Sequence, residues 1–215
     1  MSKALRITEI FYSLQGESSF VGLPTVFVRL TGCPLRCQYC DTAYAFSGGM
    51  IYELEEVLKE VASFGARHVT VTGGEPLAQP ECLPLLEALC DASYVVSLET
   101  SGAMDISQVD ERVIVVMDLK TPSSHEQSKN LIENLQYLKH NDQVKFVICN
   151  REDYEWAKSQ LAEHDLQPKV ADVLFSPSKN ELSATELAEW ILEDKLAVRF
   201  QIQLHKLLWQ DRPGH

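Results

Sequence analysis

The chain has 215 residues, with 19 Lys and Arg against 31 Asp and Glu, so its formal net charge is −12 at pH 7. This length predicts one domain, residues 1–215, with room for a substantial core. An acidic chain without a basic run argues against a protein held on nucleic acid through phosphate contacts. The N-terminal residues lack an apolar signal segment, and no apolar run is long enough to span a bilayer. We therefore expect a soluble cytoplasmic protein that binds neither nucleic acid nor a membrane.

Strand-like and helical patterns alternate along the chain. The first half of residues 5–17 alternates like a strand before a loop at Gln15-Gly16-Glu17. Apolar or β-branched runs predict strands at 26–30, 68–72, 94–98, 113–117, 143–148, 173–175 and 198–204. Apolar residues at helical spacing predict helices at 52–64, 80–90, 128–140, about 150–164 and 184–194. Strands separated by helices predict right-handed crossovers and a mostly parallel sheet. About six to seven such strands are too few for a closed β/α barrel, so the expected α/β fold is an open, partial barrel.

Polar and glycine-rich residues gather where the predicted strands end. They are residues 33–40, 73–75, Glu99, Asp118 with Lys120, and 176–179. Each cluster alone could be an ordinary strand-to-helix turn. Because the carboxyl ends of parallel strands share one edge, where ligands bind in such folds, the clusters together predict a site.

Three cysteines, Cys33, Cys37 and Cys40, follow the first apolar strand at C-x3-C-x2-C spacing. Thiolates are soft ligands, so zinc and iron–sulfur clusters are the leading candidates. A closed zinc site needs four ligands, and no second C-x2-C pair is present. A four-iron cluster held by three cysteines instead leaves one iron open to a small molecule. The other cysteines, Cys82, Cys90 and Cys149, are predicted as small apolar core residues.

Two further features allow a structural or a functional interpretation. Arg29 interrupts the first apolar strand and needs an anionic partner, either a nearby Asp or Glu or the carboxylate of a substrate. Gln15-Gly16-Glu17 could form a surface hairpin or let the backbone approach a ligand.

The cysteine spacing, together with Thr72-Gly-Gly-Glu-Pro76, resembles the radical S-adenosylmethionine (SAM) superfamily. Further motifs in one order, from residue 6 to about 206, are similar to the 7-carboxy-7-deazaguanine synthases: residues 13–17, 27–33, 40–42, 98–102, 118–122 and 205–206. The resemblance implies a single radical SAM domain and a lyase that contracts the ring of 6-carboxy-5,6,7,8-tetrahydropterin with loss of ammonia, in queuosine or deazapurine biosynthesis. It also implies a [4Fe-4S] cluster, SAM, Mg²⁺, a homodimer and a one-electron donor such as flavodoxin or ferredoxin.

The resemblance also implies a role for individual residues. Cys33, Cys37 and Cys40 would hold the cluster, and Thr42 would bind Mg²⁺. The implied SAM contacts are Tyr39, Asp41, Gly74, Glu75, Asp118, Lys120, Ser176 and Lys179. The implied substrate contacts are Gln15, Gly16, Glu17, Arg29, Thr72, Glu99 and His205.

Structural alternatives remain for several of these residues. Asp41 and Thr42 could cap a turn, Tyr39 and His205 could be packed side chains, and Glu75 could bind its own turn. The three residues between Cys33 and Cys37 lack the longer insertion that many synthases of this family have there. Some relatives end just after the His-Lys segment and contact the substrate with the terminal residue, but this chain continues after Lys206, so we do not assign it that contact. Two alternative functions remain: a small activase that makes a glycyl radical on a partner protein, and a non-catalytic iron–sulfur or zinc-binding module.

Overall fold

One mixed sheet organises the part of the chain that the structure, a computed structural model, describes: residues 4–210, 212 and 214. Its strand order is β3-β1-β2-β4-β5-β6-β7-β8-β9. β1 pairs antiparallel with β2 and β3, and every neighbouring pair from β2 to β9 is parallel. The strands are β1 (Ala4–Leu14), β2 (Pro24–Leu30), β3 (Met50–Glu53), β4 (His68–Gly73), β5 (Val95–Thr100), β6 (Ile114–Asp118), β7 (Gln143–Ile148), β8 (Asp172–Pro177) and β9 (Arg199–Phe200). The open, mostly parallel α/β sheet is confirmed, with nine described strands rather than about seven.

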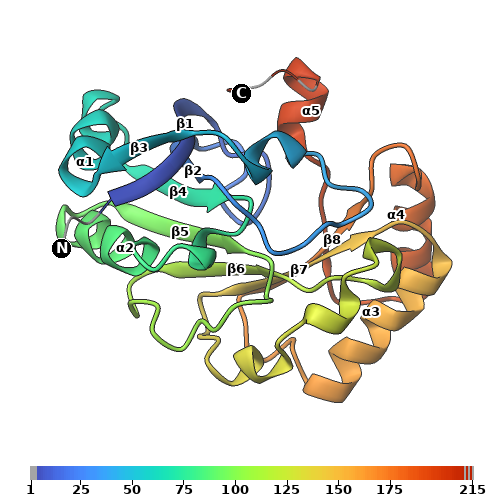
Figure 1. Cartoon of the computed structure of the whole chain (residues 1–215). Coiled ribbons are helices and arrows are strands. Elements are labelled where there is room, and N and C mark those ends of the chain that lie inside the picture. The colour runs from blue at the N-terminus through green and yellow to red at the C-terminus, as the bar shows by residue number, and fades with distance from the viewer. Residues whose placement is uncertain (1–3, 211, 213, 215) are drawn as a thin grey trace.

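Four helices cover one face of this curved sheet (Figure 1). They are α1 (Leu54–Ser63), α2 (Cys82–Asp91), α3 (Arg151–His164) and α4 (Ala184–Glu193), and α5 (Leu204–Trp209) lies apart from them. Helices α1 and α2 share a buried core with β1, β2, β4 and β5, while α3 and α4 share a second core with β6, β7 and β8. Side-chain caps begin two of the helices, since Asn150 and Ser183 accept from the backbone N–H three residues on. No helix within residues 4–210 combines the length and the apolar character needed to cross a lipid bilayer.

The predicted helix at 128–140 is wrong. The segment forms short 3-10 turns at Gln127–Lys129 and Ile132–Gln136 instead. Two asparagines explain the difference, because their side chains bind backbone groups of a neighbouring segment. Asn130 bonds the N–H and C=O of Lys120, and the buried Asn134 bonds the backbone of Gly102, Met104 and Ile106. These bonds compete with a regular helix.

Both ends of the sheet also differ from the prediction. The short edge strand β3 was not predicted, and α1 consequently begins at Leu54 rather than at residue 52. The strand expected over 198–204 ends at Phe200, because the chain turns toward the loop after β1, where the N–H of Leu204 donates to the C=O of Gly16. Of the extension after Lys206, residues 211, 213 and 215 lie outside the described residues.

Candidate active site

A cavity of about 580 Å³ lies at the carboxyl ends of the parallel strands. The alternation of β2 shows how it forms: Val26 and Val28 pack in the helix-covered core, whereas Phe27 and Arg29 line the cavity. The cavity therefore occupies the face of the sheet that α1–α4 leave uncovered. Every residue implied by the sequence as a site residue lines it, with the exception of Glu75.

The cysteine loop forms one end of this cavity. Cys33, Cys37 and Cys40 are free, partly exposed thiols that all line it. Burial raises the pKa of the Cys33 thiol, and it raises that of Cys37 to about 11, with the positive charge of Lys120 opposing the shift at both. No three His, Cys, Asp or Glu side chains of the described residues converge as they would around one metal ion. Three cysteine side chains on one loop, all lining the same cavity, are soft ligands that fit an iron–sulfur cluster.

The Gly73-Gly74-Glu75 turn packs directly against the cysteine loop. A Cβ atom on Gly74 would lie 2.2 Å from the backbone oxygen of Gly32 and 2.8 Å from the Cβ of Cys33. The N–H of Gly74 donates to Leu30 and that of Glu75 to Gly32, which ties the two loops together. Glycine at position 74 is thus required by the close approach of the two backbones.

The side chain of Glu75 is fully buried behind the cavity rather than within it. Its carboxylate accepts hydrogen bonds from the backbone N–H groups of Leu77 and Ser101 and from the hydroxyls of Thr100 and Ser101. The contact with Leu77 corresponds to the structural alternative for Glu75, in which the carboxylate binds its own turn, and the contacts with Thr100 and Ser101 at the end of β5 were not predicted.

Two buried polar atoms beside the cysteine loop have no hydrogen-bond partner among the described residues. They are the hydroxyl of Tyr39 and Oδ1 of Asp118, and both residues line the cavity. The other carboxylate oxygen of Asp118 lies 3.1 Å from Nζ of Lys120. Because buried polar atoms are normally satisfied, this pair of groups fits a bound polar molecule such as SAM.

Glutamates and their hydrogen-bond donors form the opposite end of the cavity. Glu99 accepts from the hydroxyl of Thr72 at 2.9 Å and from Nε2 of Gln15 at 3.2 Å. Glu17 accepts from Nζ of Lys145 and from Nε2 of Gln203, both at 2.6 Å. The pKa values of the two carboxyls shift in opposite directions: burial and then Glu17 raise the pKa of Glu99, whereas for Glu17 the bonds to Lys145 and Gln203 outweigh burial and lower its pKa.

Arg29 has an anionic partner within the protein. Its Nε donates to Glu9 at 2.8 Å, and the same oxygen of Glu9 accepts from the hydroxyl of Tyr44. The guanidinium nevertheless lines the cavity, with its side chain 16 % exposed. Since a guanidinium carries five N–H donors, the pair with Glu9 leaves it able to bind a carboxylate as well.

Helix α5 closes the cavity beside Asp41 and Thr42. The hydroxyl of Thr42 donates to Oδ1 of Asp41 at 2.8 Å, and Nζ of Lys206 pairs with Oδ2 of Asp41. Burial raises the pKa of Asp41, but Lys206 and the hydrogen bonds to this carboxylate outweigh burial and lower it. His205 packs on Gly16, where a Cβ atom would lie 2.2 Å from Nδ1. Burial lowers the pKa of His205, which favours the neutral imidazole.

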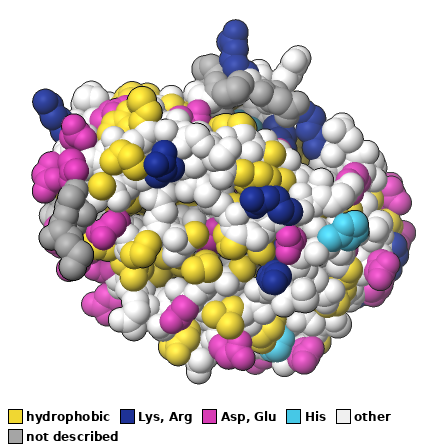
Figure 2. Space-filling view, viewed as in Figure 1, with side chains coloured by type: hydrophobic (Ala, Val, Ile, Leu, Met, Phe, Trp, Pro, Cys, Tyr) yellow, Lys and Arg dark blue, Asp and Glu magenta, His cyan; other side chains and the backbone are white. Residues whose placement is uncertain are grey.

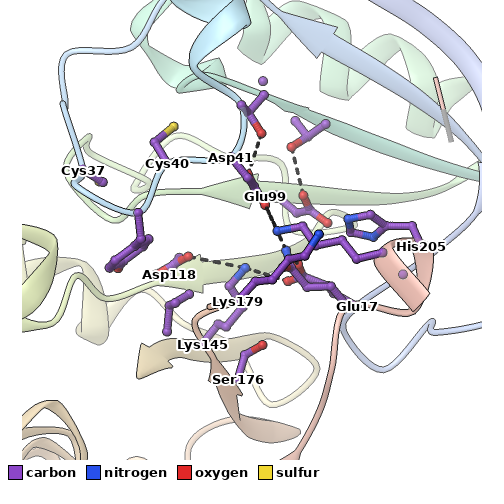
Figure 3. Close-up of a pocket in the computed structure, with 18 of the residues that line it drawn as sticks. Glu17, Cys37, Cys40, Asp41, Glu99, Asp118, Lys145, Ser176, Lys179 and His205 are labelled. Carbon is purple, nitrogen blue, oxygen red and sulfur yellow. Dashed lines mark hydrogen bonds and ion pairs between the residues drawn. The ribbon is translucent and has the colours of Figure 1, made fainter. Parts of the chain in front are cut away.

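The two ends of the site face each other across the cavity (Figure 3). Cys37 and Cys40 lie at one end, Glu17 and His205 at the other, and Asp118 and Lys145 between them. Sequence reasoning missed Lys145, Gln203 and Lys206, all of which line the cavity and contact residues that were predicted. On the face seen in Figure 2, acidic side chains are spread around the periphery and several Lys and Arg lie nearer the middle.

Comparison with known proteins places this cavity in context. Residues 27–125 match the family model of the radical SAM superfamily. The 7-carboxy-7-deazaguanine synthase of Chlorobaculum tepidum is 45 % identical over 95 % of this chain and 94 % of its own length. That of Koribacter versatilis is 42 % identical, over 95 % of this chain and 97 % of its own. The crystal structure of QueE from Escherichia coli superposes with a TM-score of 0.78 at 26 % identity, covering 94 % of this chain and 95 % of that one.

Proposed function

Because this chain belongs to the 7-carboxy-7-deazaguanine synthase family of the radical SAM superfamily, we propose that it converts 6-carboxy-5,6,7,8-tetrahydropterin into 7-carboxy-7-deazaguanine with loss of ammonia. It is thus a radical SAM lyase of deazapurine biosynthesis, built as one domain over residues 1–215. The observation that carries the proposal is that one cavity brings the three cysteines together with the residues implied to bind the substrate. The glycyl-radical activase is not favoured, since relatives at 42–45 % identity bear the synthase name.

The donor set fits a [4Fe-4S] cluster and SAM. Cys33, Cys37 and Cys40 would hold three irons, and SAM would bind in the cavity that they line. When bound, the cluster and SAM together supply the radical that removes a hydrogen atom from the substrate. Tyr39 and Asp118 offer the unpartnered polar atoms described above to SAM, and Ser176 and Lys179 line the same wall.

The glutamate end suits a pterin. A pterin presents a guanidine-like edge of N–H donors, and carboxylates are the natural acceptors for such an edge. Glu17 and Glu99 would accept these bonds, with Gln15 and Thr72 fixing the orientation of Glu99. Arg29 would bind the carboxylate of the substrate while retaining its bond to Glu9.

Mg²⁺ would be held beside this carboxylate by the hydroxyl of Thr42. Hard cations prefer oxygen ligands, and Mg²⁺ commonly keeps waters and substrate oxygens in its shell. Asp41, hydrogen-bonded to Thr42, is placed to orient such waters. A homodimer and a small one-electron donor, flavodoxin or ferredoxin, complete the proposal, and the product would enter queuosine or another deazapurine.

The test uses anaerobically reconstituted protein with reductant, SAM, Mg²⁺ and 6-carboxytetrahydropterin. Mass spectrometry should detect 7-carboxy-7-deazaguanine whose formation depends on SAM and on the cluster. SAM cleavage without this product would refute the proposed substrate but support the proposed radical chemistry. An intact cluster without any SAM cleavage would refute the proposal that this protein is a radical SAM enzyme.

A further inference from the structure

Lys145 is a largely buried cation in the middle of the cavity, paired with Glu17. In β7, Val144, Phe146 and Ile148 pack in the core beneath α3 and α4, whereas Lys145 and Val147 face the cavity. The lysine side chain is only 15 % exposed. A lysine on the inner face of a central strand needs anionic partners, because burying an unpaired ammonium is costly.

Lys145 contacts both ends of the site. Its Nζ lies 2.6 Å from Oε2 of Glu17 and 3.4 Å from Oδ2 of Asp118, and Figure 3 shows the three side chains pointing toward one another. Burial lowers the pKa of Lys145, but Glu17 and Asp118 outweigh burial and raise it well above its ordinary value. The ammonium therefore stays charged between the two carboxylates.

The two partners depend on Lys145 to different extents. Asp118 also has Lys120 at 3.1 Å. Among the residues that the structure describes, Lys145 is the one cation in ion-pair contact with Glu17. Glu99 accepts only uncharged donors there, Thr72 and Gln15, and burial, followed by the negative charge of Glu17, raises its pKa.

We propose that Lys145 is a positioning residue for the pterin, which holds Glu17 ionised and separate from Glu99 so that both carboxylates can accept N–H bonds from the donor edge of the substrate. The proposal rests on the proposed function and deepens it. Lys145 acts through Glu17 and contacts no reacting atom.

The physical reason is the behaviour of two largely buried carboxylates that line one cavity and influence each other's pKa. Without a cation, one member of such a pair tends to stay protonated, which relieves their repulsion. A protonated carboxyl presents a donor where the pterin also presents a donor, and such a mismatch is strongly penalised in a buried site. Lys145 prevents this protonation by compensating the negative charge of Glu17. Other charged or titratable groups that line the cavity around this pair include Arg29, Asp41, Asp118, Lys120, Lys179, His205 and Lys206.

The test measures binding of 6-carboxypterin, a non-reacting analogue, to reconstituted protein with SAM by isothermal titration calorimetry. Lys145→Met should weaken binding about 30-fold or more at pH 7, the lower end of the effect of truncating one member of a buried charge pair. The loss should shrink as pH rises, because both carboxyls then ionise without help. SAM affinity should change far less, since Asp118 keeps Lys120. Lys145→Arg, which keeps the charge, should restore most of the binding.

A matched control and a double variant exclude a merely structural effect. Lys158→Met removes an ion-paired lysine of α3 outside the cavity and should leave pterin binding unchanged. The double variant Glu17→Gln with Lys145→Met removes both members of the ion pair, so neither is left without its partner, and it should bind pterin no more weakly than Glu17→Gln alone. The proposal would be overturned if the losses in the double variant were additive. It would also be overturned if Lys145→Met bound pterin as tightly as wild type, or more weakly by the same factor at every pH.

Failure of the proposed substrate is recognised separately. Infrared absorption of protonated carboxyl groups needs no pterin, and Lys145→Met should show one more protonated carboxyl than wild type near pH 7. If wild-type protein fails to bind 6-carboxypterin but this band appears, the substrate is wrong and the charge role of Lys145 stands. If the band is the same in both proteins, Lys145 does not set the charge of Glu17.

Discussion

Replacing Glu75 should destabilise the protein itself, before any ligand is present. Glu75→Ala removes the acceptor for two backbone N–H groups, those of Leu77 at 3.0 Å and Ser101 at 2.7 Å, and for the hydroxyls of Thr100 and Ser101. The hydroxyls can rotate to other acceptors, but the backbone groups are fixed. Hydrogen bonds to a charged group contribute about 1.5–3 kcal/mol each, so the two backbone bonds alone predict a loss of about 3–6 kcal/mol.

Urea unfolding of the protein without SAM, followed by circular dichroism, measures this loss directly. At about 2–4 °C per kcal/mol for a chain of this size, the midpoint of thermal unfolding should fall by at least about 6 °C. Glu75→Gln keeps one oxygen acceptor and should lose less. Glu87→Ala, an exposed glutamate of α2, is the matched control and should lie within about 0.5 kcal/mol of wild type. Equal stability of Glu75→Ala and Glu87→Ala, with SAM binding lost only in the former, would refute the structural role.

Three further predictions concern the cavity. Gly16→Ala should displace His205, because the new Cβ would lie 2.2 Å from its Nδ1. The KM for the pterin should rise, while the free energy of unfolding should change by less than about 1 kcal/mol. An unchanged KM would contradict this prediction. Cys37→Ala should abolish the iron–sulfur absorption of reconstituted protein, and a full spectrum would remove Cys37 from the ligand set. Arg29→Ala should weaken pterin binding by roughly 2–5 kcal/mol, measured by calorimetry, while leaving SAM cleavage possible. Glu9→Gln removes only the internal partner of Arg29, so equal effects of the two variants would argue against a substrate clamp.

The sequence predicted the features of this structure that depend on local pattern. β-branched runs identified the parallel strands, and the polar clusters at their ends do line one cavity, because parallel strands must present their carboxyl ends at one edge. The failure at 128–140 arose from contacts distant in sequence. Its leucines follow a helical spacing, but Asn130 and Asn134 satisfy backbone groups of other segments, which no local pattern reveals.

The missed site residues have the same explanation. Lys145 occupies an inward position of an ordinary alternating strand, and its importance depends on Glu17 and Asp118, which are distant in sequence. Gln203 was assigned to a strand, because nothing local shows that the chain leaves the sheet after Phe200. Glu75 carried a motif signal, yet its hydrogen bonds to Thr100 and Ser101 at the end of β5 are visible only in three dimensions.

The pairing of residues 15–17 with residues 203–206 determines when the site can exist during biosynthesis. Gln203 donates to Glu17, and Leu204 donates to Gly16, across almost the whole length of the chain. A nascent chain that has emerged only as far as β9 can already pair every strand, yet it lacks the wall that α5 provides. The wall of the pocket that α5 forms is therefore completed only after all nine described strands have been synthesised. A purification tag fused directly after α5 would therefore start beside the pocket, whereas a tag fused before β1 would not be attached to this wall of the pocket.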